Sequence, residues 1–261
     1  PPSPHSTGRR QRQMCIRDRF ITMLNILCGC IATIFAVLNK LELAAIFVFL
    51  GIVFDFFDGL AARLFDAQSE LGIQLDSLAD VITSGLVPGI VMFQLLAMSQ
   101  TGGWNIDFGG GSNTLTWTGF KISFLAFFGC LITLASAYRL AKFNIDENQV
   151  SSVIGLPTPA NALFILSLPL ILLNQGNDYL SRIILNPWFL ILITILSSYL
   201  LNSSVELFTL KFKNWSFKDN ALRYIFIILS LVLLLTMKFL AVPVIVLFYV
   251  VSSVVYKIGA K

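Results

Sequence analysis

Residues 41–63, LELAAIFVFLGIVFDFFDGLAAR, join a continuous apolar run to two aspartates and an arginine. The run approaches the length of about 20 residues that an α-helix needs to cross a bilayer. Asp55 and Asp58 stand near its end, although a carboxylate within a membrane helix costs about 2.5–3.5 kcal/mol. The stretch therefore predicts a membrane helix that carries a functional acidic group.

The composition of the whole chain supports a membrane protein. Of its 261 residues, 56% are hydrophobic and only 12% are charged, whereas a soluble domain carries about 25% charged residues. This composition excludes both a water-soluble globule and a disordered chain. The apolar runs are continuous rather than alternating, which disfavours a transmembrane β-barrel. We predict an all-α integral membrane protein.

Eight apolar segments near the bilayer length follow one another from Phe20 onward. We predict helices over residues 20–39, 43–65, 72–99, 119–142, 159–175, 187–208, 222–238 and 240–257. Lys238 is the only break between the last two. The first six helices form a predicted core over residues 20–208, and residues 209–261 add two further transmembrane helices. Residues 1–19 share no pattern with the rest, and we expect them to be a disordered or artefactual tract.

The positions of Lys and Arg predict the orientation in the membrane. With the N-terminus inside, fourteen of the 18 Lys and Arg fall in cytoplasmic segments, as the positive-inside rule requires. Both termini are then cytoplasmic, with the connections 64–71 and 143–157 inside and the loop 101–117 outside. We expect a bacterial inner (cytoplasmic) membrane protein.

Four aspartates form a pattern across two predicted helices. Asp55 and Asp58 are three residues apart, and Asp76 and Asp80 are four apart, so each pair projects from one face of its helix. The short 64–71 connection makes the two helices antiparallel neighbours, with both pairs near the cytoplasmic end. Together, four uncompensated carboxylates would cost about 10 kcal/mol or more. Oxygen ligands without His or Cys suit Mg²⁺ or Mn²⁺.

Small residues and one arginine stand beside these aspartates. Gly59, Ala62 and Gly72 leave room for a bulky ligand, and the guanidinium of Arg63 suits phosphate oxygens. Paired metals flanked by arginine are typical of displacement at phosphorus. Intramembrane carboxylates also build proton and cation relays, so transport is the competing interpretation. The residues alone favour a membrane-embedded, metal-dependent phosphoryl-type transferase.

The residues from Asp55 to Asp80 fit the pattern D-x2-D-G-x2-A-R-x8-G-x3-D-x3-D. This resembles the signature of the CDP-alcohol phosphatidyltransferase family, and the resemblance extends over about residues 20–205. It implies a six-helix core, two bound Mg²⁺ or Mn²⁺ ions and a homodimer. RLAKFN at 139–144 and GLPTPA at 155–160 resemble stretches of the members that use L-serine, as does the Gln-Ser-Glu that ends at Glu70.

The resemblance also implies a role for each candidate residue. The metal ligands would be Asp55, Asp58, Asp76 and Asp80. Asp80 would also be the catalytic general base. The residues that contact CDP-diacylglycerol would be Thr22, Gly59, Ala62, Arg63, Ser69 and Gly72. The residues on the serine or phosphate side would be Arg139, Lys142 and Asn144. Alternatively, Arg139 and Lys142 anchor their helix at the membrane surface.

The implied reaction transfers the phosphatidyl group of CDP-diacylglycerol to the hydroxyl of L-serine and releases CMP. One alternative is the same chemistry with another acceptor, namely glycerol 3-phosphate, inositol phosphate or choline. The other is a non-enzymatic cation or proton transporter. We expect the partners to be CDP-diacylglycerol, L-serine and membrane lipids, and we expect no nucleic acid.

Overall fold

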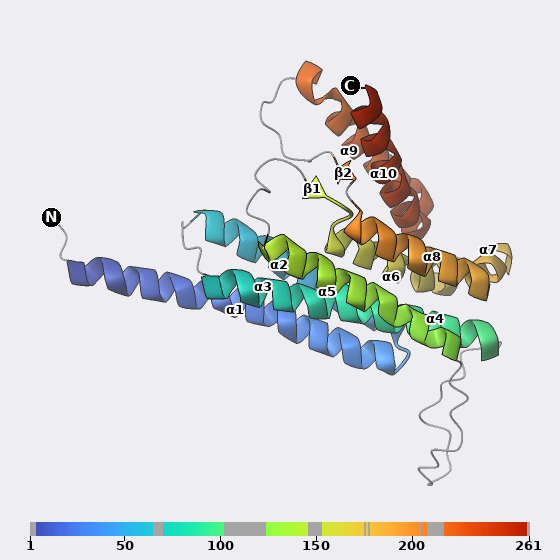
Figure 1. Ribbon diagram of the computed structural model, residues 1–261, viewed down its shortest axis with the longest axis horizontal. Coiled ribbons are helices and arrows are strands. Elements are labelled where there is room, and N and C mark those ends of the chain that lie inside the picture. Colours follow the sequence, from blue (N-terminus) through green and yellow to red (C-terminus); the bar gives the residue numbers. More distant parts are fainter. Residues whose placement is uncertain are drawn as a thin grey trace, which may run out of the picture.

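The computed structural model describes residues 4–64, 70–101, 124–145, 153–174, 176, 178–203, 205–207 and 217–259. Side chains are described throughout these ranges except at 4–19, 61–64, 70, 101, 153–154, 206, 217–223 and 255–259. Nearly all of this part is helical (Figure 1). The predicted class, an all-α integral membrane protein, is confirmed.

Among the described residues, the first half of the chain forms four α-helices, of which the last two are joined without a break by a π-helix. The α-helices are α1 (Pro4–Val37), α2 (Leu41–Leu64), α3 (Glu70–Asp80) and α4 (Val87–Thr101), and the π-helix is η1 (Val81–Leu86). The second half comprises the 3₁₀-helix η3 (Phe124–Gly129), α5 (Cys130–Ile145), α6 (Thr158–Asn174), α7 (Asp178–Ile184), α8 (Pro187–Asn202), α9 (Phe217–Met237), the 3₁₀-helix η4 (Lys238–Leu240) and α10 (Ala241–Gly259).

Five of the described helical segments are long and apolar enough to cross a membrane, or six if the bent pair α7 and α8 forms one span. Each of the eight predicted segments coincides with a helix, but α6 has only 17 residues. The short α7 was not predicted. The segment predicted over 187–208 is wrong at its end, because α8 stops at Asn202 and the chain then becomes extended.

That extended segment forms a short ladder. β1 (Val153–Ile154) pairs antiparallel with β2 (Glu206–Leu207). Gly155 follows β1 with a φ of 72°, a left-handed conformation that glycine adopts readily. Its backbone N–H donates to the carbonyl of Val205 at 2.9 Å. These backbone bonds explain why the apolar run beyond α8 does not continue as helix.

The last two helices form a hairpin. Phe226 of α9 and Phe248 of α10 stack with ring centroids 6.0 Å apart, whereas 22 residues of one straight helix would separate them by about 33 Å. The chain reverses at Lys238, whose φ is 51°. Lys238 is the break that the sequence predicts. The hairpin packs against α6 through α10 and lies beside the main bundle in Figure 1.

Residues 4–19 are helical and continue α1, whereas the sequence predicts a disordered or artefactual tract over residues 1–19; that this tract is artefactual stays a prediction. Arg, Gln and Met, which dominate it from Arg9 onward, are good helix formers. No Pro or Gly separates Arg9 from Phe20, so the helix extends outward from its apolar part. The division of the chain into a core and an added hairpin stays a prediction.

The centre of the bundle is the continuous segment α3–η1–α4. On α4, Val87, Val91, Met92, Leu95 and Leu96 are completely buried. The outer helices leave many apolar side chains exposed, as expected for surfaces that face lipid. The third predicted helix is therefore the one around which the others pack.

Close packing at this centre depends on glycine. A Cβ atom at Gly129 would lie 2.5 Å from the backbone N of Phe93 and 2.8 Å from the carbonyl oxygen of Gly89. Both contacts are with backbone, which cannot move aside as a flexible side chain can. η3 and α4 can therefore approach this closely only with glycine at position 129.

We expect Gly129→Ala to destabilise the protein, because overpacking typically costs about 1–3 kcal/mol. The measurement is the thermal unfolding midpoint of the protein purified in detergent. Gly59→Ala is the matched control, since a Cβ there meets nothing within 4 Å. Equal midpoints for the two variants would contradict the close packing of η3 on α4.

Candidate active site

The two predicted pairs of aspartates meet between α2 and α3. The carboxyl groups of Asp55 and Asp76 hydrogen-bond to each other, and Asp58 and Asp80 lie within electrostatic range of Asp55. Asp58 is buried, and the other three are partly buried. Four acidic side chains therefore form one cluster at the end of α2.

Helix α1 contributes polar side chains to this cluster. The hydroxyl of Thr22 donates a hydrogen bond to Oδ2 of Asp58. One turn further along, the carboxamide of Asn25 faces Asp80. Thr22 and Asn25 are almost completely buried. Because α1 carries no acidic residue in its apolar part, it supplies only hydrogen-bonding groups to the carboxylates.

Helix α5 brings a cation and an amide to α3. Arg139 interacts electrostatically with Asp80. Asn144 accepts a hydrogen bond at 3.1 Å from the hydroxyl of Ser77, the residue next to Asp76. Lys142 is exposed. The structure thus brings Arg139 and Asn144 to the helix that carries the second pair of aspartates.

The remaining candidates are only partly covered by the described residues. Gly59 is exposed, and the space where a side chain would stand is open. Gly72 is partly buried in α3. Ala62 and Arg63 lie in α2, but their side chains are outside the described part, as is Ser69. The open surface at Gly59 adjoins Asp58 in the chain.

The cluster has the chemistry of a site for a hard divalent cation. In the described part of the chain, no three or more His, Cys, Asp or Glu side chains form a ready-made ligand group. The contact between the carboxyl groups of Asp55 and Asp76 nevertheless holds only with a proton or a cation between them. Carboxylate oxygens are the ligands that Mg²⁺ and Mn²⁺ prefer, so the chemistry of the four aspartates suits such ions, and their role as metal ligands stays a prediction.

Three polar residues of this region were missing from the predicted site: Asn25, Ser77 and Thr83. The hydroxyl of Thr83 donates to Oδ1 of Asn25 at 2.8 Å. Spacing could have pointed to them, because Asn25 follows Thr22 by three residues and Thr83 follows Asp80 by three. Residues three apart share a helix face.

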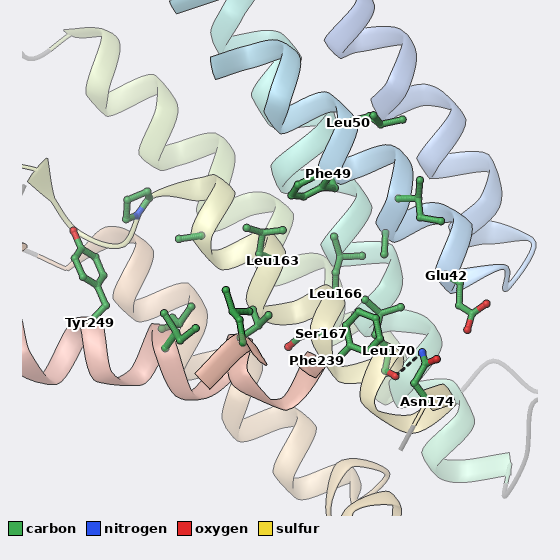
Figure 2. Close-up of a pocket in the computed structure, with 18 of the residues that line it drawn as sticks. Glu42, Phe49, Leu50, Leu163, Leu166, Ser167, Leu170, Asn174, Phe239 and Tyr249 are labelled. Atoms are coloured by element: carbon green, nitrogen blue, oxygen red, sulfur yellow. Dashed lines mark hydrogen bonds between the residues drawn. The ribbon is translucent and has the colours of Figure 1, made fainter. Parts of the chain in front are cut away.

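A large apolar groove lies elsewhere in the bundle. It has a volume of about 840 Å³ and is bounded by α2, α6 and the C-terminal hairpin. Figure 2 shows Phe49, Leu163 and Leu166 along it, with Glu42 and Asn174 toward one end. Phe49 and Asp58 are nine residues apart on α2, or two and a half turns, so they face opposite sides. The groove is therefore separate from the acidic cluster.

The fold and the cluster together define a helical membrane protein with an acidic site enclosed among its apolar helices. A family model described as CDP-alcohol phosphatidyltransferase matches residues 18–199. The chain belongs to the CDP-alcohol phosphatidyltransferase family, which confirms the resemblance inferred from the sequence pattern. Members of this family generally depend on divalent metal ions.

The chain is also similar to proteins named CDP-diacylglycerol–serine O-phosphatidyltransferase. The Bacillus subtilis protein is 31% identical over 139 residues, which are 53% of this chain and 67% of that protein. The Methanocaldococcus jannaschii protein is 29% identical over 59% of this chain and 60% of its own length. The Helicobacter pylori protein is 32% identical over 55% and 53%. The chain thus spans about half to two thirds of these relatives.

We expect the acidic cluster to bind Mn²⁺, with an affinity at least tenfold lower in Asp76→Asn, which removes a charged ligand. The measurement is electron paramagnetic resonance of free Mn²⁺ during titration of the purified protein. Glu42→Gln is the matched control, because Glu42 lies on α2 but lines the groove. Equal loss of binding in both variants would mean that Mn²⁺ associates with acidic residues in general.

Proposed function

We propose that this chain transfers the phosphatidyl group of CDP-diacylglycerol to the hydroxyl of L-serine, giving phosphatidylserine and CMP. The observation that carries the proposal is the placement of Arg139 beside Asp80 within the acidic cluster. Family membership supplies the donor chemistry, and the names of the relatives favour serine as the acceptor. Because the matches cover only part of each relative, the activity of this chain is a proposal, supported by its family and by the names of the relatives.

Under this proposal the four aspartates bind the metal ions, and one of them, Asp80, also acts as the general base. Asp55, Asp58, Asp76 and Asp80 would hold two Mg²⁺ or Mn²⁺ ions. When bound, such ions neutralise the diphosphate and stabilise charge at phosphorus. Thr22 keeps the carboxylate of Asp58 in place by hydrogen bonding. Ala62, Arg63 and Ser69, with Gly59 and Gly72, are proposed contacts of the CDP-diacylglycerol head group.

Asp80 accepts the proton of the serine hydroxyl in the proposed reaction. The serine oxygen forms a bond to the β-phosphorus while the bond from that phosphorus to the CMP oxygen breaks. General base catalysis requires Asp80 to reach the hydroxyl at hydrogen-bond distance. A serine whose carboxylate binds Arg139 would bring its hydroxyl toward Asp80, because Arg139 interacts with Asp80 and the hydroxyl of serine lies only a few bonds from its carboxylate.

The acceptor side of the site lies between α3 and α5. The guanidinium of Arg139 can clamp a carboxylate with two parallel hydrogen bonds. Asn144, which accepts a hydrogen bond from Ser77 at 3.1 Å, would fix the amino or carboxylate group. The exposed Lys142 is a weaker candidate and suits attraction of the anionic substrate.

A direct assay tests the proposed function. Purified protein in lipid vesicles is supplied with CDP-diacylglycerol, Mg²⁺ or Mn²⁺ and one alcohol, and the release of CMP is followed. The protein should release CMP when L-serine is supplied, but not when glycerol 3-phosphate, inositol phosphate or choline is supplied instead. If CMP is released only with another alcohol, that alcohol is the acceptor. Cation or proton flux without CMP release would favour a transporter.

We expect Arg139→Ala to raise the KM for L-serine about 10-fold or more, since a hydrogen bond to a charged group contributes about 1.5–3 kcal/mol. The KM for CDP-diacylglycerol should change little. Arg139→Lys should restore binding only in part, because a point charge cannot reproduce the guanidinium fork. Arg182→Ala, an exposed cation on α7, is the control. If Arg139→Ala raises the KM values of both substrates equally, Arg139 anchors its helix at the membrane surface or contacts a lipid phosphate.

We also propose that both termini and the acidic cluster face the cytoplasm, and that the protein is a homodimer. Single cysteines at Asp66 and Asn113, on a cysteine-free background, should then react with impermeant maleimide from opposite sides of the membrane. The measurement is labelling in intact cells compared with inverted vesicles. Labelling of both positions from one side would refute the predicted order of crossings.

A further inference from the structure

A π-helical turn follows Asp80 without interruption. η1 covers Val81–Leu86, between α3 and α4, and its Thr83, Ser84 and Gly85 are buried. A π-turn places one extra residue in the helix and is frequent at functional sites. Here it changes the register of the central segment immediately after Asp80. Asp80 is the residue that immediately precedes this turn, so the contacts that hold the turn lie beside it.

Helix α1 holds the π-turn through Thr83. The hydroxyl of Thr83 lies 2.8 Å from Oδ1 of Asn25 and 3.3 Å from the Asn25 backbone carbonyl oxygen. Both residues are 1% exposed. Because a hydroxyl has a single proton to donate, the Oδ1 contact at 2.8 Å is the better hydrogen bond. Thr83 thereby fixes which way the Asn25 carboxamide points.

Two glycines make the slot that Thr83 occupies. A Cβ atom at Gly29 of α1 would lie 2.5 Å from Oγ1 of Thr83. A Cβ atom at Gly51 of α2 would lie 2.6 Å from its Cγ2 and 2.8 Å from Oδ1 of Asn25. All three distances are too short for real atoms, so α1 and α2 close around Thr83 only because these positions are glycine.

Helix α5 holds the other side of the same turn. The hydroxyl of Thr133 donates to the carbonyl oxygen of Gly85 at 3.1 Å. Two turns later on this helix, Arg139 interacts with Asp80. The π-turn is therefore fixed from α1 and from α5, and Asp80 interacts with a residue of each of these helices.

The Nδ2 amide group of Asn25 is the part of its carboxamide that Thr83 does not bind. Its Oδ1 accepts from Thr83, which leaves Nδ2 as a donor, and the carboxamide faces Asp80. Nδ2 is buried without a hydrogen bond of acceptable geometry. A buried donor without an acceptor costs about 1–3 kcal/mol, and the carboxylate of Asp80 is the acceptor beside it.

We propose that Asn25 and Thr83 are positioning residues for Asp80: Thr83 orients the Asn25 carboxamide so that its Nδ2 donates to the Asp80 carboxylate and holds it toward the acceptor hydroxyl. The inference rests on the proposed role of Asp80 as general base. It differs from substrate binding, because neither residue needs to touch either substrate.

Thr83→Val tests the contact, because valine has the shape of threonine without the donor. We expect kcat to fall about 10- to 100-fold, the scale of a small misplacement of a reacting group. Both KM values should stay within about twofold, since the contact acts on the chemical step. Thr83→Ser should restore most of the loss. Thr194→Val is the control, since Thr194 is as buried but donates only within its own helix, to the Leu190 carbonyl oxygen at 2.8 Å.

Asn25→Asp tests whether the Nδ2 donor of Asn25 matters, because aspartate has nearly the same size and shape as asparagine. It keeps an acceptor for Thr83 but replaces the Nδ2 donor with an oxygen, so kcat should fall as in Thr83→Val. The double variant should lose no more than the worse single one, because the two residues act in series. A normal kcat in Thr83→Val, a rise in the KM for CDP-diacylglycerol, or no rescue by Thr83→Ser would overturn the proposal.

Mn²⁺ binding provides a readout that does not depend on turnover. Thr83→Val should lower the affinity for Mn²⁺ several-fold by displacing Asp80, whereas Thr194→Val should not. Asn25→Asp is not used in this titration, because its added carboxylate would itself attract the cation. If the wild-type protein releases no CMP with any alcohol, the proposed function fails, and the positioning of Asp80 is still decided by this titration. Unchanged Mn²⁺ affinity in Thr83→Val would then refute it.

Discussion

Four carboxylates within reach of one another among apolar helices repel each other and resist removal from water. Without compensation they would cost about 10 kcal/mol or more, comparable to the whole stability of a typical domain. The compensating groups come from other helices: α1 supplies the Thr22 hydroxyl and α5 supplies Arg139. The need to neutralise and solvate the acidic cluster therefore explains why α1 and α5 flank the central segment at this level.

Small residues let these helices come close enough to do so. Gly29 and Gly51 allow α1 and α2 to enclose the π-turn, and Gly129 allows η3 to meet α4 backbone to backbone. Helices within lipid gain little from the hydrophobic effect on association and depend on close packing and hydrogen bonds instead. A larger side chain at these positions would separate the polar groups of α1 from the carboxylates they serve.

The sequence predicts those features that depend on local pattern. Apolar length locates the helices, and the spacing of the aspartates places each pair on one face of its helix. Lys238 predicts the reversal of the hairpin, which its φ of 51° realises. Features that depend on neighbours far along the chain were missed. The end of α8 at Asn202 follows from strand pairing with β1, which hydropathy does not record.

The site was predictable to the same extent and for the same reason. Asp55, Asp58, Asp76 and Asp80 are recognisable because charge is rare in this chain and their spacing is regular. Thr83 and Asn25 are less distinct, and only their spacing from Asp80 and Thr22 points to them, because polar uncharged residues in membrane helices commonly bond to their own backbone, as Thr194 does. Thr83 instead bonds to α1 from within a π-turn, and no local pattern specifies a π-turn.

Helix α3 presents the second pair of aspartates to two different sets of partners. Asp76 meets Asp55 of α2, on the side where α1 and α2 would hold the nucleotide lipid. Asp80 meets Arg139 of α5, on the side proposed for the acceptor. One turn of helix separates the two aspartates, about 5.4 Å along the axis. Under the proposed function, donor and acceptor meet along the one face of α3 that carries both aspartates, so the spacing of two residues on one rigid helix sets their alignment.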